Sequence, residues 1–208
     1  RGIPDLVAVR NGEPERMFDR GIAAYGGMSR FVKKGQTVVI KPNMSWNSGP
    51  EGAANTNPYL IKRIVEHCFD AGARRVYVFD HSISYWKTVF EKSGIAPAAR
   101  EAGATVVSGN SESYYEKVRI PGGKQLKEAE VHELILENDV FINVPVLKHH
   151  GSTQLTMAMK NLMGVVWDRG YYHYHGLHQC IADFCLFRKP DLNVLDAYRV
   201  VLRNGPGY

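Results

Sequence analysis

The sequence of 208 residues has only three cysteines, and no two of them form a C-x-x-C pair. They are Cys68, Cys180 and Cys185. An odd number of scattered cysteines argues against a disulfide framework and against a zinc ribbon. A self-contained iron–sulfur cluster bound by four thiolates would need one more cysteine than the chain has. No apolar run approaches the ~18 residues of a transmembrane helix, so we expect no membrane span.

Signature motifs of several protein classes are also missing. The sequence contains no G-x-S-x-G nucleophile elbow and no P-loop, and its glycine pairs do not open a helix directly after a strand, which disfavours an NTPase or a standard NAD dehydrogenase. The net charge of +5 comes from 26 Lys and Arg against 21 Asp and Glu. Because no Lys/Arg block or RNA-binding aromatic motif is present, we expect a small anionic ligand and no nucleic-acid partner.

Short β-branched runs alternate with amphipathic segments along the whole chain. Strands are expected over 6–9, 36–40, 75–79, 105–107, 139–144 and 192–195, with an edge strand over 117–120. Helices are expected over 13–26, 58–72 with Asn57 as N-cap, 96–102, 131–136, 153–163 and 177–187. This order predicts an α/β fold: a mostly parallel β-sheet with helices on both faces, in a Rossmann-like three-layer arrangement.

We expect residues 1–208 to form a single α/β domain. The sequence begins with Arg1 and not with methionine, and it ends in a glycine-rich segment at Tyr208. We therefore expect a trimmed N-terminus and a natural chain that continues beyond Tyr208.

Polar side chains follow four of the expected strands at their carboxyl ends. Ligands of open α/β sheets bind at that edge, so these side chains are expected on one rim. The four groups are Lys41 with Asn43, Asp80 with His81, Lys148 with His149 and His150, and Asp196.

Two long stretches lack carboxylates but contain lysines. Neither 22–49 nor 142–166 has an Asp or Glu, whereas the first contains Lys41 and the second Lys148 and Lys160. A crevice lined by both stretches would favour a carboxylate or phosphate ligand. Thr156 precedes Lys160 by one turn of the expected helix, and partial burial among Met and Leu would lower the pKa of Lys160 and suit it to anion clamping, proton transfer or imine chemistry. The alternative is a lysine whose stem is buried while its ammonium stays in water.

Histidines are unevenly distributed. Five of the eight fall within 149–178. His173, His175 and His178 could converge on one transition metal, with Asp80, His81 or Asp196 completing the ligand set. The alternative is a Tyr/His-rich lid whose histidines bind substrate or pack.

Five segments, taken in order, resemble one known family. They are VKKGQTVVIKPN at 32–43, NTNPYLI at 55–61, DVFINVPVLKHH at 139–150, LTMAMKNLMGVV at 155–166 and LNVLDAYRVVLRNGP at 192–206. Together they resemble the domain of unknown function family 362. The motif residues that carry over are Lys41, Asn43, Lys148, His149, Thr156, Lys160, Asn161, Asp196, Gly205 and Pro206.

The resemblance implies an association with iron–sulfur clusters, since family members are often linked to ferredoxin-like 4Fe–4S segments. A carrier of such a cofactor would work with a redox partner protein. The subset most similar to this chain carries a twin-arginine export signal, which implies a periplasmic or otherwise exported protein.

Three hypotheses follow. The first is a redox or metal-assisted enzyme acting on a small anion, in which Lys41, Lys148 and Lys160 clamp the anion, Asn43 and Asn161 orient it with Thr156, and His149 or His150 transfers protons. The second is a non-catalytic carrier of a metal or iron–sulfur cofactor that works with a redox partner. The third is a structural partner subunit that needs no ligand.

Overall fold

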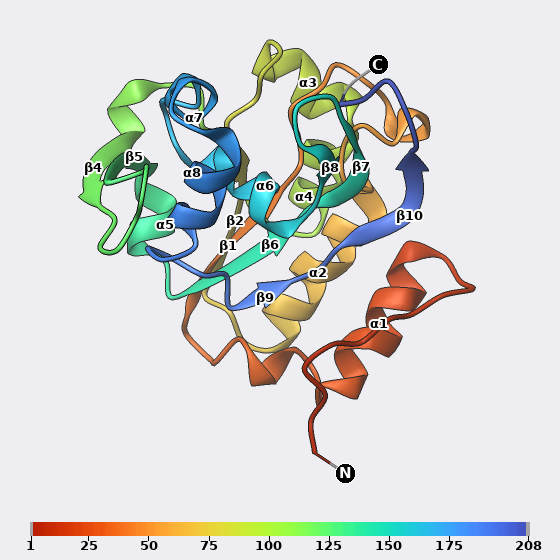
Figure 1. Ribbon diagram of the computed structural model, residues 1–208. Coiled ribbons are helices and arrows are strands. Elements are labelled where there is room, and N and C mark those ends of the chain that lie inside the picture. The colour runs from red at the N-terminus through yellow and green to blue at the C-terminus, as the bar shows by residue number, and fades with distance from the viewer. Residues whose placement is uncertain (1, 207–208) are drawn as a thin grey trace.

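The structure is a computed structural model that describes residues 2–206. At its centre lies a five-stranded sheet in the order β3-β2-β1-β6-β9 (Figure 1). All neighbouring pairs in this sheet are parallel. Its strands are β1 Thr37–Pro42, β2 Arg75–Asp80, β3 Thr105–Ser108, β6 Val140–Val144 and β9 Leu192–Asn193.

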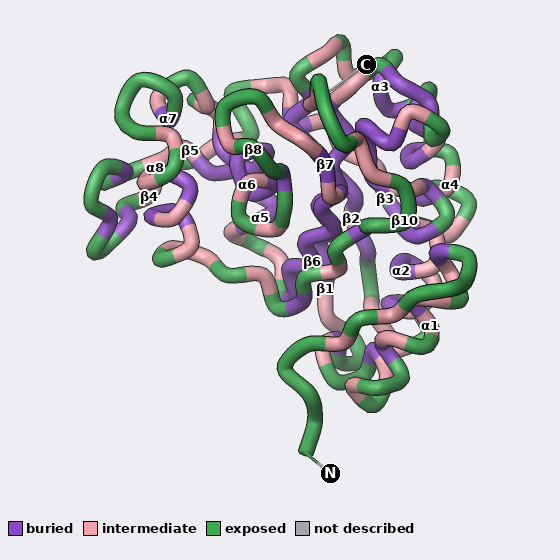
Figure 2. Tube along the Cα trace, turned by 45° about the vertical axis from the view of Figure 1, so that its right-hand side comes forward, coloured by how far each residue is buried: buried purple, intermediate pink, exposed green. Residues whose placement is uncertain are grey.

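Helices cover both faces of this sheet. Val38 and Ile40 of β1 pack in one core cluster with α1 Pro14–Ala24, α2 Pro58–Asp70, α3 Trp86–Lys92 and α4 Ile95–Glu101. Val39 points the opposite way and packs with α5 Glu133–Glu137, α7 Gly170–Tyr174 and α8 Leu177–Phe184. This alternation follows from the two-residue repeat of a strand. Figure 2 shows the central strands as the most continuously buried part of the chain. The predicted three-layer α/β fold is confirmed.

Helix α2 shows how local sequence sets an element boundary. The Asn57 side chain accepts hydrogen bonds from the backbone N–H groups of Tyr59, at 2.9 Å, and Leu60, at 3.3 Å. Pro58 occupies the first turn, where a missing N–H costs nothing. The predicted cap at Asn57 is confirmed.

A second sheet lies beside the end of β6, and the sequence did not predict it. After Pro145 the chain continues as β7 Val146–His150, which pairs with β8 Gln154–Thr156 and with β10 Asp196–Val201. The helix expected over 153–163 is therefore wrong at its start. Residues 154–156 extend along β7, and only α6 Ala158–Asn161 and the 3-10 turn η4 Leu162–Val165 are helical.

Three further expectations need correction. The strand expected over 6–9 does not form, and Leu6 is 82% exposed. The strand expected over 192–195 ends at Asn193, and a separate strand, β10, begins at Asp196. The first residues of the helix expected over 131–136 pair instead in the hairpin of β4 Tyr115–Arg119 and β5 Glu128–His132.

The remaining short elements are the 3-10 turns η1 Met28–Arg30, η2 Pro50–Gly52 and η3 Glu112–Tyr114. Across residues 2–206, no helix is both long enough and apolar enough to cross a membrane. The expectations about Arg1 and Tyr208 concern positions outside the described residues.

Candidate anion-binding site

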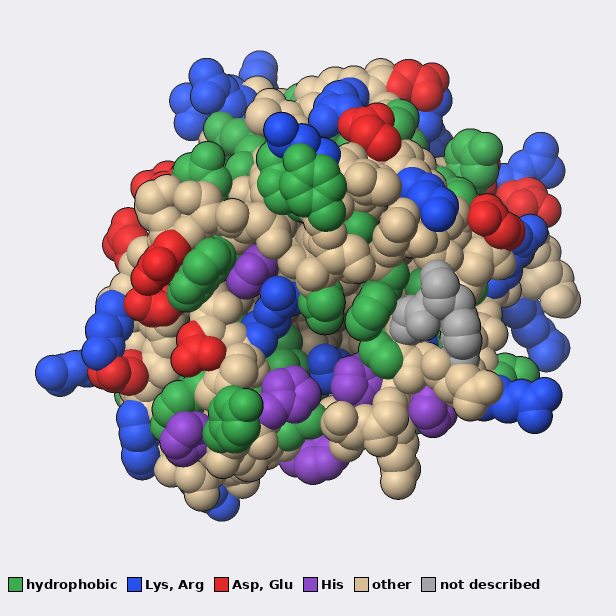
Figure 3. Space-filling model, turned by 90° about the horizontal axis from the view of Figure 1, so that it is seen from above, with side chains coloured by type: hydrophobic (Ala, Val, Ile, Leu, Met, Phe, Trp, Pro, Cys, Tyr) green, Lys and Arg blue, Asp and Glu red, His purple; other side chains and the backbone are tan. Residues whose placement is uncertain are grey.

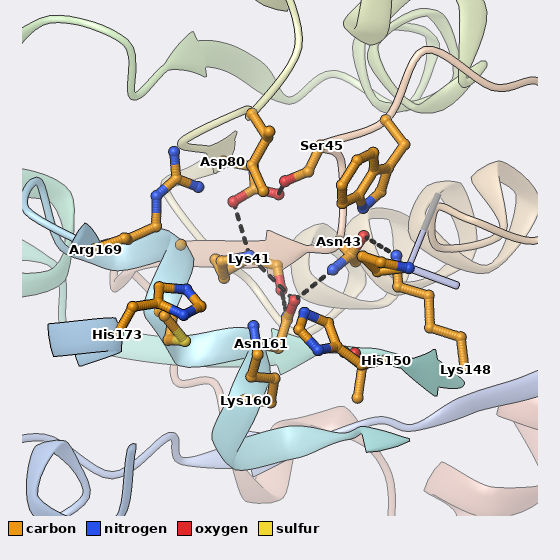
Figure 4. A pocket seen from close by; sticks show the side chains of 16 residues that line it. Lys41, Asn43, Ser45, Asp80, Lys148, His150, Lys160, Asn161, Arg169 and His173 are labelled. Carbon is orange, nitrogen blue, oxygen red and sulfur yellow. Dashed lines mark hydrogen bonds and ion pairs between the residues drawn. The ribbon is translucent and has the colours of Figure 1, made fainter. Parts of the chain in front are cut away.

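A cavity of about 260 Å³ lies at the carboxyl ends of β1 and β2, against β7 and α6. Figure 3, which views the molecule from above, shows histidine side chains around a hollow in which Lys or Arg side chains are visible. Figure 4 shows the side chains that line the cavity. They are Lys41, Asn43, Ser45, Trp46, Asp80, Ile83, Lys148, His150, Thr156, Lys160, Asn161, Met163, Gly164, Arg169, His173 and Pro206.

The base of the cavity is a buried ion pair. Nζ of Lys41 lies 2.8 Å from Oδ1 of Asp80, and both side chains are at most 1% exposed. The second carboxylate oxygen of Asp80 accepts hydrogen bonds from the Met44 N–H, at 2.7 Å, and the Ser45 hydroxyl, at 3.0 Å. Burial lowers the pKa of Lys41, while the adjacent carboxylate of Asp80 opposes that shift. Asp80 is thus engaged with Lys41.

A chain of amides joins this pair to a second lysine. Oδ1 of Asn161 accepts hydrogen bonds from Nζ of Lys41 and from Nδ2 of Asn43, each at 3.2 Å. Oδ1 of Asn43 accepts a hydrogen bond from Nζ of Lys148 at 3.1 Å. Lys148 also donates to the Ala54 carbonyl. These bonds fix both lysines, and burial lowers the pKa of Lys148 to about 7.

Lys160 and Arg169 supply the cations that are not neutralised. Lys160 lies on α6, and within residues 2–206 no carboxylate or hydrogen-bond acceptor is paired with its Nζ. Burial, together with the charges of Arg169 and Lys41, lowers the pKa of Lys160 to about 8. Nη1 of Arg169 donates to the His81 carbonyl at 2.8 Å, which leaves its other N–H groups for a ligand. The predicted partial burial of Lys160 is correct.

His150 lines the cavity as a neutral hydrogen-bond donor. Its Nδ1 accepts hydrogen bonds from the backbone N–H groups of Ser152, at 3.1 Å, and Thr153, at 3.4 Å. A neutral ring whose Nδ1 accepts must carry its proton on Nε2. Burial and the nearby lysines lower the pKa of His150 to about 4, so the ring stays neutral near pH 7. The proton-transfer role expected for His150 therefore does not suit this environment.

Thr156 adds an unused polar group. It lies opposite Lys148 in the β7–β8 pair and is 3% exposed. Its hydroxyl oxygen is buried and has no hydrogen-bond partner among the described residues. A buried hydroxyl without a partner is costly, so a ligand in the cavity that bonds to it would gain affinity.

His149 points away from this cavity. Successive residues of a strand face opposite sides, so Lys148 and His150 reach the cavity while His149 does not line it. The backbone of His149 instead packs against Gly205, where a Cβ would lie 2.2 Å from the His149 carbonyl oxygen. His149 is therefore not among the residues that line the cavity.

The residues expected to bind a metal do not come together. Within residues 2–206, no three His, Cys, Asp or Glu side chains are grouped so that they could hold a metal ion. His173 lines the cavity, whereas His175 stacks on Tyr171 and His178 is exposed on α8.

The three residues expected to complete the ligand set of the metal have other partners. His81 stacks on Trp167 with ring centroids 5.0 Å apart. Asp196 accepts hydrogen bonds from the backbone N–H groups of Asn57, at 2.7 Å, and Tyr198, at 3.1 Å, and so ties β10 to the start of α2. Asp80, the third, forms the ion pair with Lys41.

The cysteines do not fit an iron–sulfur cluster. Cys68 lies in the core cluster under α2, while Cys180 and Cys185 lie with the cluster on the opposite face of the sheet. Burial raises the pKa of Cys68 to about 12 and also raises the pKa values of the other two thiols, which disfavours the thiolate form that binds iron. The three thiols therefore do not form a cluster site.

Sequence reasoning missed several residues of the site. Arg169 follows no strand and belongs to no motif. The one sequence feature that sets it apart is that no other arginine occurs between Arg119 and Arg188. Ser45 and Gly164 were also missed, because their importance comes from contacts with the Lys41–Asp80 pair.

Comparison with known proteins agrees with the fold. A crystal structure of a protein from Thermotoga maritima is similar with a TM-score of 0.52 at 12% identity, over 82% of this chain and 44% of that chain. The Thylakoid-associated protein sll1697 of Synechocystis sp. is 24% identical over 189 residues, which cover 87% of this chain and 57% of the relative. The chain thus spans little more than half the length of this curated relative.

A family model matches most of the chain. The model described as Domain of unknown function (DUF362) matches residues 38–208, which include β1 except for Thr37, the whole of β7 and the whole of α6. The chain therefore belongs to the family of domain of unknown function 362.

Proposed function

We propose that this domain is part of an enzyme that binds a small anionic substrate in the cavity between β1, β2, β7 and α6. The observation that carries the proposal is the charge of the lining. Four cationic side chains, Lys41, Lys148, Lys160 and Arg169, line the cavity, and Asp80 is the one carboxylate among the lining residues. Because Asp80 is already paired with Lys41, an anion would meet uncompensated positive charge in a partly dehydrated space.

Each lining group has a distinct part in this proposal. Arg169 and Lys160 would bind the anion by charge-assisted hydrogen bonds, which are stronger than neutral ones. The Thr156 hydroxyl and Nε2 of His150 would donate hydrogen bonds to uncharged oxygen atoms of the substrate. Lys160 also suits proton transfer near neutral pH, because its pKa is lowered to about 8.

The metal-assisted variant of the enzyme hypothesis has less support. It would need grouped imidazole, thiolate or carboxylate ligands, and within residues 2–206 those side chains are dispersed. The same dispersal removes the support for a metal or cluster carrier. We therefore propose substrate binding and proton transfer by the lysine-lined cavity itself.

The test is calorimetric titration of the protein with inorganic phosphate, sulfate, acetate and succinate. At least one anion should bind saturably, and Lys160→Met or Arg169→Met should weaken binding by about 10- to 100-fold, since each removes a charge-assisted bond of about 1.5–3 kcal/mol. Lys34→Met is the matched control, because Lys34 is an exposed lysine of the carboxylate-free stretch 22–49 outside the cavity. Equal affinity in all three variants, or no binding of any anion, would refute the proposal.

A further inference from the structure

We propose that the anionic ligand of this cavity also carries a carbonyl group, and that Lys160 forms an imine with that carbonyl. This inference rests on the proposed function, because it assigns a chemical class to the same ligand. The class consists of small molecules in which an aldehyde or ketone lies close to a carboxylate or phosphate.

Lys160 differs from the other two cavity lysines because its Nζ has no ion-pair or hydrogen-bond partner within residues 2–206. Nζ of Lys41 forms an ion pair with Asp80 and donates hydrogen bonds to the Pro42 carbonyl and to Asn161. Nζ of Lys148 is held by Asn43 and the Ala54 carbonyl, and it lies 5.4 Å from the centre of the Trp46 ring. Figure 4 shows the Lys160 amine reaching into the space between His173, His150 and Asn161.

The surroundings of Lys160 favour an uncharged amine, which is the form that attacks a carbonyl. The charged or titratable groups facing the cavity are Lys41 from β1, Asp80 from β2, Lys148 and His150 from β7, and Arg169 and His173 beside or on α7. Only Asp80 is acidic, and it is paired with Lys41. With a pKa of about 8, roughly a tenth of Lys160 is neutral at pH 7.

The two neutral donors of the cavity suit the carbonyl end of such a ligand. Thr156 has a buried hydroxyl without a partner, and His150 keeps its proton on Nε2. Both would donate hydrogen bonds to the carbonyl oxygen and so polarise the carbon that Lys160 attacks. Arg169, which lies on the far side of Lys160 from His150 in Figure 4, is the cation available for the anionic group.

The proposed step is a condensation in which no atom is oxidised or reduced. The lone pair of the neutral Lys160 amine forms a bond to the carbonyl carbon, and the carbonyl π electrons move to oxygen. A proton passes from nitrogen to that oxygen and gives a carbinolamine. The carbon–oxygen bond then breaks, and the oxygen leaves as water with the second proton from nitrogen. The product is a carbon–nitrogen double bond between the ligand and Lys160.

The experiment traps the imine by reduction. The protein is incubated at about pH 8 with pyruvate or with glycolaldehyde phosphate in the presence of sodium cyanoborohydride, which reduces imines to stable amines. Acetone and glycolaldehyde are the matched probes without an anionic group. Adducts are counted by intact-protein mass spectrometry and located by peptide mapping.

We expect one adduct per chain on Lys160 with at least one anionic probe, forming at least tenfold faster than with its uncharged counterpart. Lys160→Arg is the decisive variant, because it keeps the positive charge and should still bind the anion while forming no adduct. Lys34→Met should react like the unchanged protein.

Three outcomes would overturn the inference. If calorimetry shows that the anionic probes bind but no adduct forms on Lys160, the imine is refuted and the proposed anion-binding function stands. If adducts form equally on exposed lysines and persist in Lys160→Arg, the imine is likewise refuted. If no probe and no simple anion binds at all, the proposed function fails together with the inference.

Discussion

Replacing Gly164 with alanine tests the packing around the Lys41–Asp80 pair. A Cβ at position 164 would lie 2.4 Å from Oδ1 of Asp80, 2.6 Å from Cε of Lys41 and 2.7 Å from Nζ of Lys41. These separations are far inside van der Waals contact, so either the pair or the turn η4 must move. Neither side chain moves freely, because Asp80 is also held by Met44 and Ser45, and Lys41 by Asn161 and the Pro42 carbonyl.

The size of the effect follows from two costs. Overpacking a close-packed site destabilises a protein by about 1–3 kcal/mol. If the ion pair is forced apart, an uncompensated buried charge adds a cost, and breaking a buried pair outright costs about 3–5 kcal/mol. We therefore expect Gly164→Ala to lower the free energy of unfolding by about 2–4 kcal/mol.

Urea-induced unfolding followed by circular dichroism measures this change. Gly151→Ala is the matched control, because an added Cβ there meets nothing within 4 Å, and its effect should stay within about 0.5 kcal/mol. A Gly164→Ala variant that is as stable as this control would refute the packing argument. It would mean that the pair is not held in the geometry described above.

Three other predictions follow from the structure. Lys148 has a pKa of about 7 in the folded chain and an ordinary value of 10.5 when unfolded, so the unfolded state binds more protons between these values. The free energy of unfolding should therefore rise with pH between about 7 and 8.5, with a contribution of at most about 1.4 kcal/mol per pH unit that Lys148→Met abolishes; an unchanged slope in the variant would contradict this. Asp196→Ala should cost about 1–3 kcal/mol in urea unfolding by leaving the Asn57 and Tyr198 N–H groups without their acceptor, yet leave anion affinity unchanged; a loss of anion binding in a folded variant would speak against a purely structural role. Iodoacetamide at pH 7 should alkylate Cys68 far more slowly in the native protein than in urea, as measured by mass spectrometry, and equal rates would show that the thiol is accessible.

The central sheet, and the side chains at the carboxyl ends of its strands, could be predicted from the sequence. Runs of β-branched residues form strands by local preference and burial, so β1, β2, β3 and β6 could be located within a few residues. Side chains that directly follow parallel strands share one edge, which is why Lys41 and Asn43 were correctly placed together with Asp80. The absence of carboxylates from 22–49 and 142–166 then indicated that the cavity lining would be positively charged.

Segments whose conformation depends on distant partners could not be predicted in this way. Residues 154–156 belong to a segment whose apolar residues have helical spacing, yet these three residues are extended. The reason is that Leu155 pairs with His149 of β7, and Thr156 pairs with Lys148. That pairing moves Thr156 off the helix of Lys160, although both side chains still reach the cavity. A periodic pattern reports which residues prefer burial, but it does not report which strand is available to pair with them.

Tertiary structure alone decided which polar groups are free and which are occupied. Asp80 lies at the carboxyl end of β2, where a metal ligand could lie, but its partner is Lys41 of the neighbouring strand β1. His150 is adjacent to His149 in sequence, yet only His150 lines the cavity, and its Nδ1 is occupied by its own turn. Most polar side chains of the cavity lining were therefore named by the sequence, although Ser45 and Arg169 were not. Their charge, protonation and availability depend on neighbours that only folding brings within a few ångströms.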